Sequence, residues 1–254
     1  MQTSIFKPID TETRKILMRL TVLGNNGPYP APGGACSGYL VESDSGETKI
    51  LLDCGTGVLS RLTDRISLGE LSAVVLSHLH YDHMSDMLPM HYALQFNPRP
   101  RPLPVYAPAE PGNVRMLLKG DSIDVWPMRE TTVGEMKLSF CPVRHPVETF
   151  AVCVECDGAR LVYTGDTNTD FALELFCDSA DLLLADAGLP KEKHTESSPH
   201  LSAALCGKLA RDTHSRRLLL THLNPKFDAS ALLREAQEVF PAAELAVCGE
   251  SWYI

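Results

Sequence analysis

The chain has 254 residues, of which 44% are hydrophobic and 22% charged, and its net charge is −9. This composition is typical of a globular protein and excludes a disordered chain, and no apolar run approaches the ~20 residues of a transmembrane helix. The acidic balance excludes a basic surface over the whole molecule, the usual basis of non-specific nucleic-acid binding, although it leaves a local basic patch open.

The N-terminus and the cysteines indicate the compartment. Residues 1–13 contain acids and a proline in place of a basic start and an apolar core, so we expect no secretory signal. Eight cysteines in a chain of this length favour free thiols over a disulfide framework. We therefore expect a cytoplasmic protein.

Short β-like runs alternate with helical stretches along the first half of the chain. The expected strands are Lys15–Leu23, Gly38–Glu42, Lys49–Asp53, Ala73–Ser77 and Leu103–Ala107. The expected helices are Thr56–Arg65, Ser85–Phe96 and Glu110–Leu118.

The second half repeats this pattern. Its expected strands are Met136–Phe140, Phe150–Glu155, Arg160–Thr164, Asp181–Ala185, Arg217–Thr221 and Glu244–Val247, and its expected helices are Phe171–Phe176, Leu201–Arg211 and Ala229–Phe240. Each half begins with paired strands and then alternates strand and helix. This predicts an α/β fold in which two mixed sheets lie face to face with helices on the outer faces, an αββα sandwich. We expect residues 15–254 to form one domain after an N-terminal extension, residues 1–14.

The strongest local signal is the run His78-Leu79-His80-Tyr81-Asp82-His83, directly after an apolar strand. Three imidazoles and a carboxylate this close can meet at one point as metal ligands, and the alternative is a solvated polar loop. Imidazole and carboxylate together suit zinc, and also iron or manganese. The position at the carboxyl end of a strand, where sites form in α/β folds, favours metal ligation.

Three further residues of ligand type each follow a strand-like segment. His145 follows residues 138–143, Asp166 follows residues 161–164, and His222 follows residues 218–221. A single histidine after a strand is more often structural. Three such residues, in a chain that already carries the cluster, favour ligation.

In this order, the His-x-His-x-Asp-His run, His145, Asp166 and His222 resemble the metallo-β-lactamase fold superfamily of dinuclear metal hydrolases, over nearly the whole chain. The resemblance implies two bound divalent metal ions, preferably zinc, with manganese or iron as alternatives. It implies that one ion is bound by His78, His80 and His145, the second by Asp82, His83 and His222, and that Asp166 bridges them. The presence of His80 favours hydrolytic members over the flavodiiron type, which usually has glutamate there.

Within that superfamily the chain looks most like ribonuclease Z-like and cyclic-phosphodiesterase-like proteins. Four segments carry this likeness: the Gly-rich loop 24–38, residues 53–57, residues 145–149, and the run His200-Leu201-Ser202-Ala203-Ala204. The last is similar to the His-Ser-Thr-Ala segment of ribonuclease Z, with Leu201 departing from it. The likeness implies that His200 donates a proton, and Asp82 and His200 are taken as the catalytic residues.

Two of these residues have a second interpretation. His200 could instead begin a helix and face solvent. Asp53 ends an apolar strand, where it would either hold a ligand imidazole or make a simple turn before Gly55.

A tRNA substrate is the second choice. Ribonuclease Z members that carry their tRNA-binding arm at this point have it between the third-ligand histidine and the bridging aspartate. Here only residues 146–165 separate His145 from Asp166, and two expected strands occupy them. The basic residues expected near the mouth of the site, Arg99, Arg101 and Lys226, are too few to hold a folded RNA.

These features together predict a metal-dependent hydrolase acting on small or cyclic phosphodiesters. Two divalent ions ~3.5–4 Å apart lower the pKa of a bridging water and neutralise phosphate oxygens, and His200 would protonate the leaving oxygen. We expect a homodimer, because enzymes of this kind are commonly homodimers. We expect no membrane association. The alternatives are a tRNA 3′ endonuclease, a metal-site sensor with little turnover, and a carboxylic-ester or thioester hydrolase.

Other conspicuous residues are expected to be structural. Cys153 and Cys156 form a C-x-x-C within a strand, where their side chains face opposite sides, so they predict no metal or redox site. The remaining residues fall into three groups: packing tryptophans (Trp126 and Trp252), methionines that face the core (Met84, Met87 and Met90), and surface histidines (His91, His194 and His214).

Overall fold

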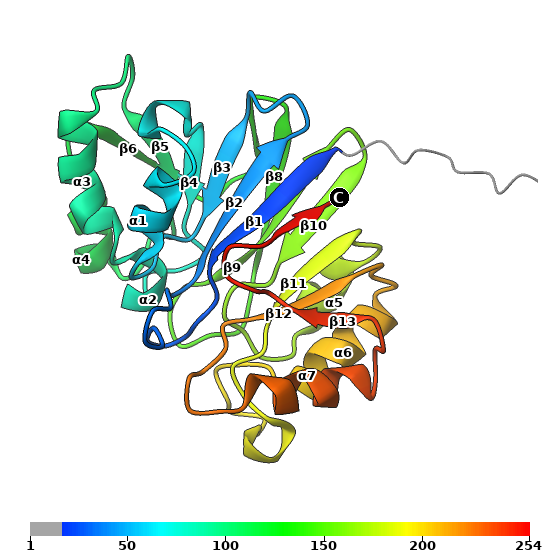
Figure 1. Cartoon of the computed structure of the whole chain (residues 1–254). Helices are drawn as coiled ribbons and strands as arrows, with labels where there is room; N and C mark the ends of the chain where they lie inside the picture. Colours follow the sequence, from blue (N-terminus) through cyan, green and yellow to red (C-terminus); the bar gives the residue numbers. More distant parts are fainter. Residues whose placement is uncertain (1–16) are drawn as a thin grey trace, which may run out of the picture.

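A computed structural model describes residues 17–254, so the expected N-terminal extension, residues 1–14, lies outside the described residues. Two seven-stranded sheets form the centre of the molecule (Figure 1). The first sheet has the order β14 (Ser251–Tyr253), β1 (Met18–Gly24), β2 (Gly38–Ser43), β3 (Lys49–Leu52), β4 (Ala73–Val75), β5 (Leu103–Tyr106) and β6 (Ile123–Trp126). The second has the order β13 (Ala243–Leu245), β12 (Leu218–Thr221), β11 (Leu182–Asp186), β10 (Ala159–Tyr163), β9 (Phe150–Cys156), β8 (Met136–Pro142) and β7 (Thr131–Val133).

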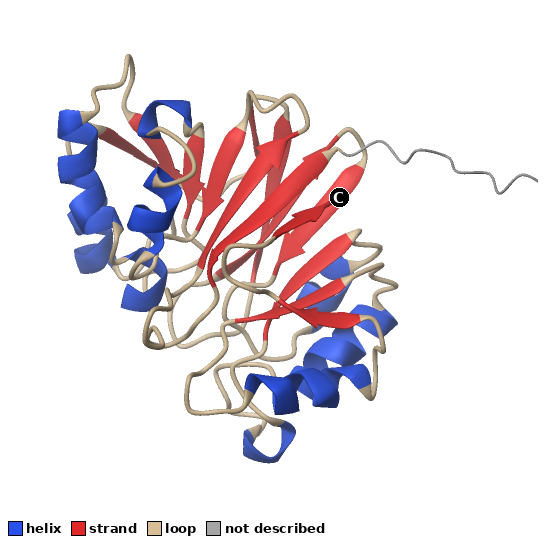
Figure 2. Ribbon diagram, viewed as in Figure 1, coloured by secondary structure: helices blue, strands red, loops and turns tan. Residues whose placement is uncertain are grey.

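The helices lie on the two outer sides of the sheets (Figure 2). On the side of the first sheet these are α1 (Val58–Thr63), α2 (Tyr81–Met84), α3 (Met87–Phe96), α4 (Gly112–Arg115), and the 3₁₀ turns η1 (Leu68–Glu70) and η2 (Met116–Leu118). On the side of the second sheet they are α5 (Phe171–Cys177), α6 (Ala203–Asp212), α7 (Ala229–Gln237) and the 3₁₀ turn η3 (Lys191–Lys193). The predicted αββα sandwich of two mixed sheets is confirmed.

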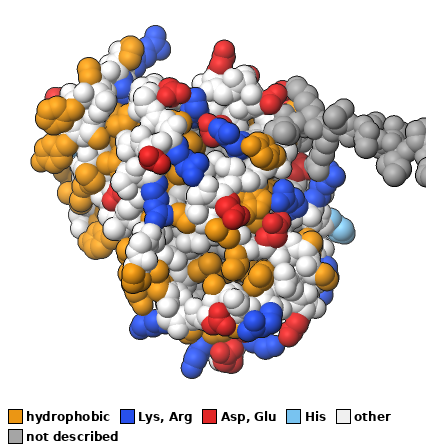
Figure 3. Space-filling model, in the orientation of Figure 1, with side chains coloured by type: hydrophobic (Ala, Val, Ile, Leu, Met, Phe, Trp, Pro, Cys, Tyr) orange, Lys and Arg blue, Asp and Glu red, His pale blue; other side chains and the backbone are white. Residues whose placement is uncertain are grey.

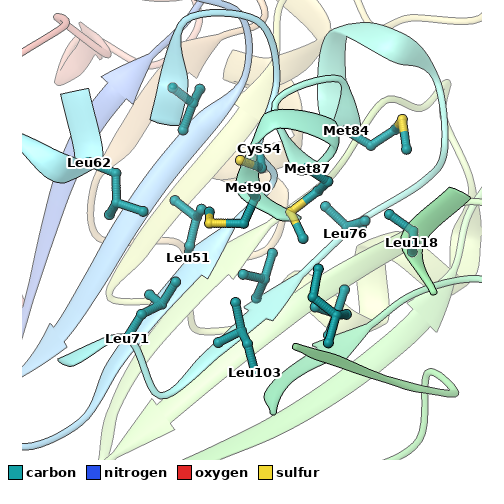
Figure 4. Close-up of a cluster of buried hydrophobic side chains, with 14 of the residues drawn as sticks. Leu51, Cys54, Leu62, Leu71, Leu76, Met84, Met87, Met90, Leu103 and Leu118 are labelled. Carbon is teal, nitrogen blue, oxygen red and sulfur yellow. The ribbon is translucent and has the colours of Figure 1, made fainter. Parts of the chain in front are cut away.

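Three apolar clusters hold these layers together. Strand residues alternate between them: in β3, Ile50 and Leu52 face the second sheet, whereas Leu51 faces the helices. Figure 4 shows part of the outer cluster of the first sheet, where Leu51 meets Leu62 of α1 and Met90 of α3. Met84, Met87 and Met90 are buried, as predicted. Cys153 and Cys156 fall in different clusters, which confirms that they face opposite sides of β9.

The predicted helix Ser85–Phe96 corresponds to α3, which begins two residues later, and the sequence did not predict α2, a short separate helix that begins inside the histidine run. The break between the two helices occurs because Asp86 bonds elsewhere. Its backbone N–H donates to the Cys54 carbonyl at 3.0 Å, and its carboxylate accepts from the Leu59 N–H at the start of α1 at 2.9 Å. This contact fixes the histidine run against the loop after β3.

The sequence pattern did not predict β6, β7 or β14. β14 follows the expected last strand and crosses to the first sheet, where it pairs with β1 and places Trp252 in the core between the sheets. The packing prediction for Trp126 was wrong, because this side chain ends edge strand β6 and is 49% exposed. No helix in the described part of the chain is long and apolar enough to cross a membrane.

Strand direction decides which loops can reach the site. β4 leads into the histidine run, and β5 is parallel to β4, so the loop before β5 lies at the opposite end of the sheet. Arg99 and Arg101 line a surface pocket of about 200 Å³ on that loop, so the expectation that they lie near the mouth of the site was wrong. Lys226, four residues after His222, is exposed on the loop that follows β12.

Candidate functional site

The residues predicted as metal ligands meet at one edge of the sandwich. The loop after β4 brings His78, His80, Asp82 and His83, and the loops after β8, β10 and β12 bring His145, Asp166 and His222. His222 directly follows its strand with a φ of 53°, and Asp53 follows β3 with a φ of 55°. This left-handed backbone conformation turns the chain sharply after each of the two strands. Residues other than glycine adopt it only where the surrounding structure holds them in it.

His78, His80 and His145 form the first ligand group. The Nδ1 atom of His80 lies 3.1 Å from the Nε2 atoms of both His78 and His145. The outward nitrogens of the other two rings meet neutral acceptors: His145 Nδ1 donates to the Pro199 carbonyl at 3.0 Å, and His78 Nδ1 lies 3.0 Å from Ser77 Oγ. Ser77 Oγ itself donates to Asp53, so it accepts from His78. The inward Nε2 atoms of His78 and His145 therefore carry lone pairs.

Asp82, His83 and His222 form the second ligand group. His222 Nε2 lies 3.1 Å from Asp82 Oδ2, and His83 Nε2 lies 3.5 Å from the same oxygen. Carboxylates stand behind both rings of this group. His83 Nδ1 donates to Asp53 Oδ2 at 2.8 Å, and His222 Nδ1 lies 3.4 Å from Asp186 Oδ1.

Asp166 lies between the two groups. Its Oδ2 is 3.6 Å from His78 Nε2 and 3.2 Å from His222 Nε2, and its Oδ1 is 3.3 Å from His83 Nε2. Asp166 Oδ1 and His83 Nε2 are buried and have no hydrogen-bond partner. Buried polar atoms without partners are costly, and converging lone pairs repel unless a cation lies among them. The donor set and its geometry therefore fit divalent metal ions.

The two groups have opposite electrostatics. Burial lowers the pKa of each imidazole of the first group, His78, His80 and His145. Burial also opposes the charged forms of His83 and His222, but there the Asp166 carboxylate and the carboxylate behind each ring outweigh it. They raise the pKa of His83 well above its usual value and the pKa of His222 to about 10.

Asp53 lies directly behind the predicted ligand His83, as expected if it holds a ligand imidazole. Besides His83, its carboxylate accepts hydrogen bonds from the Ser77 N–H at 2.7 Å and from the Tyr163 hydroxyl at 2.8 Å. It is fully buried. These bonds fix the carboxylate, which in turn fixes the ring orientation of His83.

His200 lies at the site and does not face solvent. Its Nδ1 is 2.9 Å from Asp186 Oδ2 and 3.8 Å from Asp166 Oδ2, and its ring stacks on His222. Burial disfavours its charged form, but the Asp186 carboxylate outweighs burial and raises the pKa of His200. The side chain stays 20% exposed, so its other nitrogen, Nε2, remains available to a substrate.

Sequence reasoning missed Asp186, the carboxylate behind both His200 and His222. The Thr167 and Gly188 N–H groups donate to it at 3.1 and 2.9 Å, and it is fully buried. A signal was present, because Asp186 ends the apolar run Leu182–Leu184 just as Asp53 and Asp166 follow apolar strands. The predicted strand stopped one residue before it.

The Gly-rich loop lies against one of the predicted ligands. A Cβ atom at Gly27 would overlap the ring of His222, so only glycine lets the loop backbone lie against that ligand.

Three histidines were expected at the surface, away from the site. His91 donates to the Leu117 carbonyl, and His214 is exposed. His194 does not stand free on the surface, as expected from the sequence, because its Nε2 bonds to the Asn168 side chain at 2.9 Å.

The family model "Beta-lactamase superfamily domain" matches residues 48–223, more than half of the chain. The chain belongs to the β-lactamase superfamily. It is 32% identical over 247 residues to the Bacillus subtilis protein named "Probable metallo-hydrolase YhfI", covering 92% of this chain and 99% of that protein. The crystal structure of YhfI superposes with a TM-score of 0.88 at 30% identity, over 94% of this chain and 100% of YhfI.

Other members of the superfamily have more specific names. A Mycobacterium bovis ribonuclease Z is 32% identical over 201 residues, covering 67% of this chain and 68% of the ribonuclease. A diphosphatase from the PhnP family has a TM-score of 0.70 at 18% identity, over 93% of this chain and 97% of the diphosphatase, and this likeness shows the shared fold alone. The matches to the family model and to YhfI identify the chain as a metallo-hydrolase of the β-lactamase superfamily.

Proposed function

We propose that this metallo-hydrolase cleaves small linear or cyclic phosphodiesters and uses two divalent metal ions, preferably zinc. The two ligand groups would each hold one ion, and Asp166 would be a ligand of both. The observation that carries the proposal is the His200–Asp186 pair beside these groups, with His200 Nδ1 2.9 Å from one carboxylate and 3.8 Å from Asp166. A leaving alkoxide needs a proton, and this pair is built to supply one. The superfamily relative named ribonuclease Z also supports cleavage of a phosphodiester.

Each residue of the site has a part in this reaction. The ions, when bound, supply Lewis-acid charge that activates water and offsets the negative charge of the phosphoryl oxygens. Asp186 holds His200 through Nδ1 and keeps it protonated, so Nε2–H can donate to the leaving oxygen. We keep Asp82 both as a ligand and as a catalytic residue: its carboxylate, 3.1 Å from His222 Nε2, would help to hold the second ion beside the reacting ester. Asp53 orients His83.

Substrate size follows from the hairpin between two ligands. Residues 146–165, which separate His145 from Asp166, form the β9–β10 hairpin of the second sheet and leave no extended arm there. The chain has 23 basic and 32 acidic residues, and Arg99 and Arg101 lie at the far end of the first sheet. A folded RNA needs many phosphate contacts from Lys and Arg. A small phosphodiester needs one or two, so it is the preferred substrate.

The test is a metal analysis combined with a substrate panel on purified protein. The panel contains a nitrophenyl phosphodiester, an alkyl phosphodiester, a cyclic mononucleotide and a precursor tRNA, all at physiological salt. We expect about two ions per chain and turnover of the small esters. We expect His200→Ala to slow the alkyl ester by ~10²–10⁴-fold and the nitrophenyl ester much less, because nitrophenolate leaves without a proton.

Other outcomes of the panel would replace the proposal. Efficient tRNA cleavage with a steep salt dependence would favour an endonuclease of the ribonuclease Z type. Metal binding without turnover of any ester would favour a sensor. Turnover of carboxylic esters or thioesters alone would favour the third alternative.

We also propose a homodimer, formed through a surface of α3 and η2. Leu88, Tyr92 and Phe96 share one face of α3 at four-residue spacing, and Tyr92 and Phe96 are 68% and 84% exposed. Met116 and Leu117 of η2 are also exposed, and η2 lies beside α3, where His91 donates to the Leu117 carbonyl. We call these five residues the α3 surface; apolar side chains gather on this side of the molecule (Figure 3).

The α3 surface fits a second copy because α3 contains no Asp, Glu, Lys or Arg. Two copies of a chain with a charge of −9 can meet there without facing their own carboxylates. Aromatic side chains bury ~150–250 Å² each, so these residues supply a large part of the ~800 Å² per partner of a standard interface. Phe96→Glu should yield monomers by light scattering, whereas Phe171→Glu on exposed α5 should not. A monomeric unmodified protein would contradict the proposal.

We place the protein in the cytoplasm, as its cysteines suggested. All eight are free thiols in the described part of the chain, and seven of them are buried. Free thiols persist in a reducing compartment.

A further inference from the structure

Asn168 is a fully buried polar residue that the proposed function does not use. It stands two residues after Asp166, on the turn that follows β10. Its backbone N–H donates to the Arg144 carbonyl at 3.1 Å, directly before the ligand His145. The backbone of Asn168 therefore already joins the segments of two predicted ligands.

The side chain of Asn168 joins a third segment. Its Nδ2 group donates to three carbonyls, those of Ser198 at 2.8 Å, Glu196 at 3.1 Å and Thr195 at 3.3 Å. Its Oδ1 accepts from the Thr169 N–H at 2.7 Å and from His194 Nε2 at 2.9 Å. These partners fix the orientation of the amide, because an oxygen in place of Nδ2 would face three carbonyl oxygens.

The segment bound by Asn168 leads directly into the site. Pro199 offers its carbonyl to His145 Nδ1 at 3.0 Å, and His200 places its Nδ1 2.9 Å from Asp186. In the part of the chain that the structure describes, the other hydrogen bonds of residues 194–198 stay within this loop or run to Lys191. The amide of Asn168 is thus the polar link between this loop and the body of the second sheet.

We propose that Asn168 is a positioning residue for the catalytic site. Its amide holds residues 194–198 on the turn after β10, and thereby sets the Pro199 carbonyl against His145 and His200 against Asp186. The part of this inference that concerns His200 rests on the proposed function, in which His200 is the proton donor. A loop anchor with no positioning role would affect stability and would not distinguish between substrates.

The test uses Asn168→Asp, which keeps the shape but places an oxygen against the three carbonyls, and Asn168→Ala, which removes the bonds without repulsion. Asn97→Asp makes the same chemical change at an exposed residue after α3 and is the matched control. The first readout is hydrogen–deuterium exchange of residues 194–200 in protein stripped of metal by chelation. We expect faster exchange there in both Asn168 variants and wild-type exchange in the control.

The second readout is leaving-group dependence. We expect the Asn168 variants to hydrolyse an alkyl phosphodiester about 10–100-fold more slowly, with a smaller loss on the nitrophenyl ester. In a His200→Ala background, Asn168→Ala should not change the ratio of the two rates further, because both substitutions remove the same proton donation.

The two proposals can fail separately. If His200→Ala slows both esters equally, the acid role of His200 in the proposed function fails. Faster exchange at residues 194–200 together with weaker metal binding would then still support positioning through His145. Wild-type exchange in both Asn168 variants, or an equal loss on both esters while His200→Ala discriminates between them, would overturn the role of Asn168.

Discussion

The two ligand groups differ in what stands behind their imidazoles. In the first group, His78 and His145 donate outward to neutral oxygens, those of Ser77 and Pro199. In the second, His83 and His222 face the buried carboxylates of Asp53 and Asp186. The second group also contributes Asp82, so it carries more negative charge than the first.

This difference predicts two unequal metal positions. A carboxylate behind an imidazole makes the ring a stronger metal ligand, so the second group should bind its ion more tightly at neutral pH. Asp166 and the carboxylate behind each ring raise the pKa of His83 and His222, so protons compete with metal there, whereas burial lowers the pKa of the first group's rings. Acidification should therefore weaken the second position relative to the first.

Removing the carboxylate that the two groups share should have the largest effect, because it weakens both metal positions. Asp166 lies within 3.6 Å of nitrogens from both groups, so Asp166→Ala should weaken both positions and lower turnover by ~10³-fold or more. Metal content by mass spectrometry and turnover of a nitrophenyl phosphodiester measure the two effects. Asp124→Asn, an exposed carboxylate change on β6, is the control. A folded Asp166→Ala protein with two ions and full turnover would contradict the assignment.

Much of the fold could be predicted from sequence because the signals are local. Apolar runs such as Leu182–Leu184 mark central strands, and the Asp157-Gly158 turn marks the β9–β10 hairpin. β6, β7 and β14 were missed because they are strands of three or four residues without clear alternation. β14 depends on β1, more than 200 residues away in the chain.

The predicted metal ligands could also be found from sequence, but most of the residues that support them could not. The seven expected ligands meet because each follows the carboxyl end of a strand, a position that the sequence reveals. The residues behind them were harder to find, because a carboxylate such as Asp186 acquires its role from two rings that reach it through space, those of His200 and His222. Asn168 gave no sequence signal, since its partners are the backbone carbonyls of a loop.

Removing the charge behind one imidazole should weaken one metal position more than the other. Asp53→Asn keeps the shape but removes the charge behind His83, so the tighter of two binding events should weaken by about 10–100-fold. Calorimetric titration of chelator-treated protein with zinc resolves the two events. Tyr163→Phe removes one hydrogen bond to the same carboxylate and leaves its charge, so it is the matched control. Equal weakening of both events by Asp53→Asn would contradict the asymmetry.

The smallest expected effect concerns pH and separates the two supporting carboxylates. If protonated His200 donates to the leaving oxygen, the rate on an alkyl phosphodiester falls as pH rises through the pKa of His200. Asp186 raises that pKa, so the active range extends upward in the unmodified protein. Asp186→Asn keeps an oxygen near Nδ1 but removes the charge, so the basic limb of the rate profile should move to lower pH.

The two supporting carboxylates provide the control for this prediction. Asp53→Asn makes the same chemical change behind His83 and does not contact His200, so it should lower the rate without moving the basic limb. His200→Ala should remove the limb, and Asp186→Asn added to it should produce no shift. A limb that stays in place in Asp186→Asn, or moves equally in Asp53→Asn, would mean that the titrating group is not His200. The carboxylate of Asp186 would then serve only to orient His222, as Asp53 orients His83.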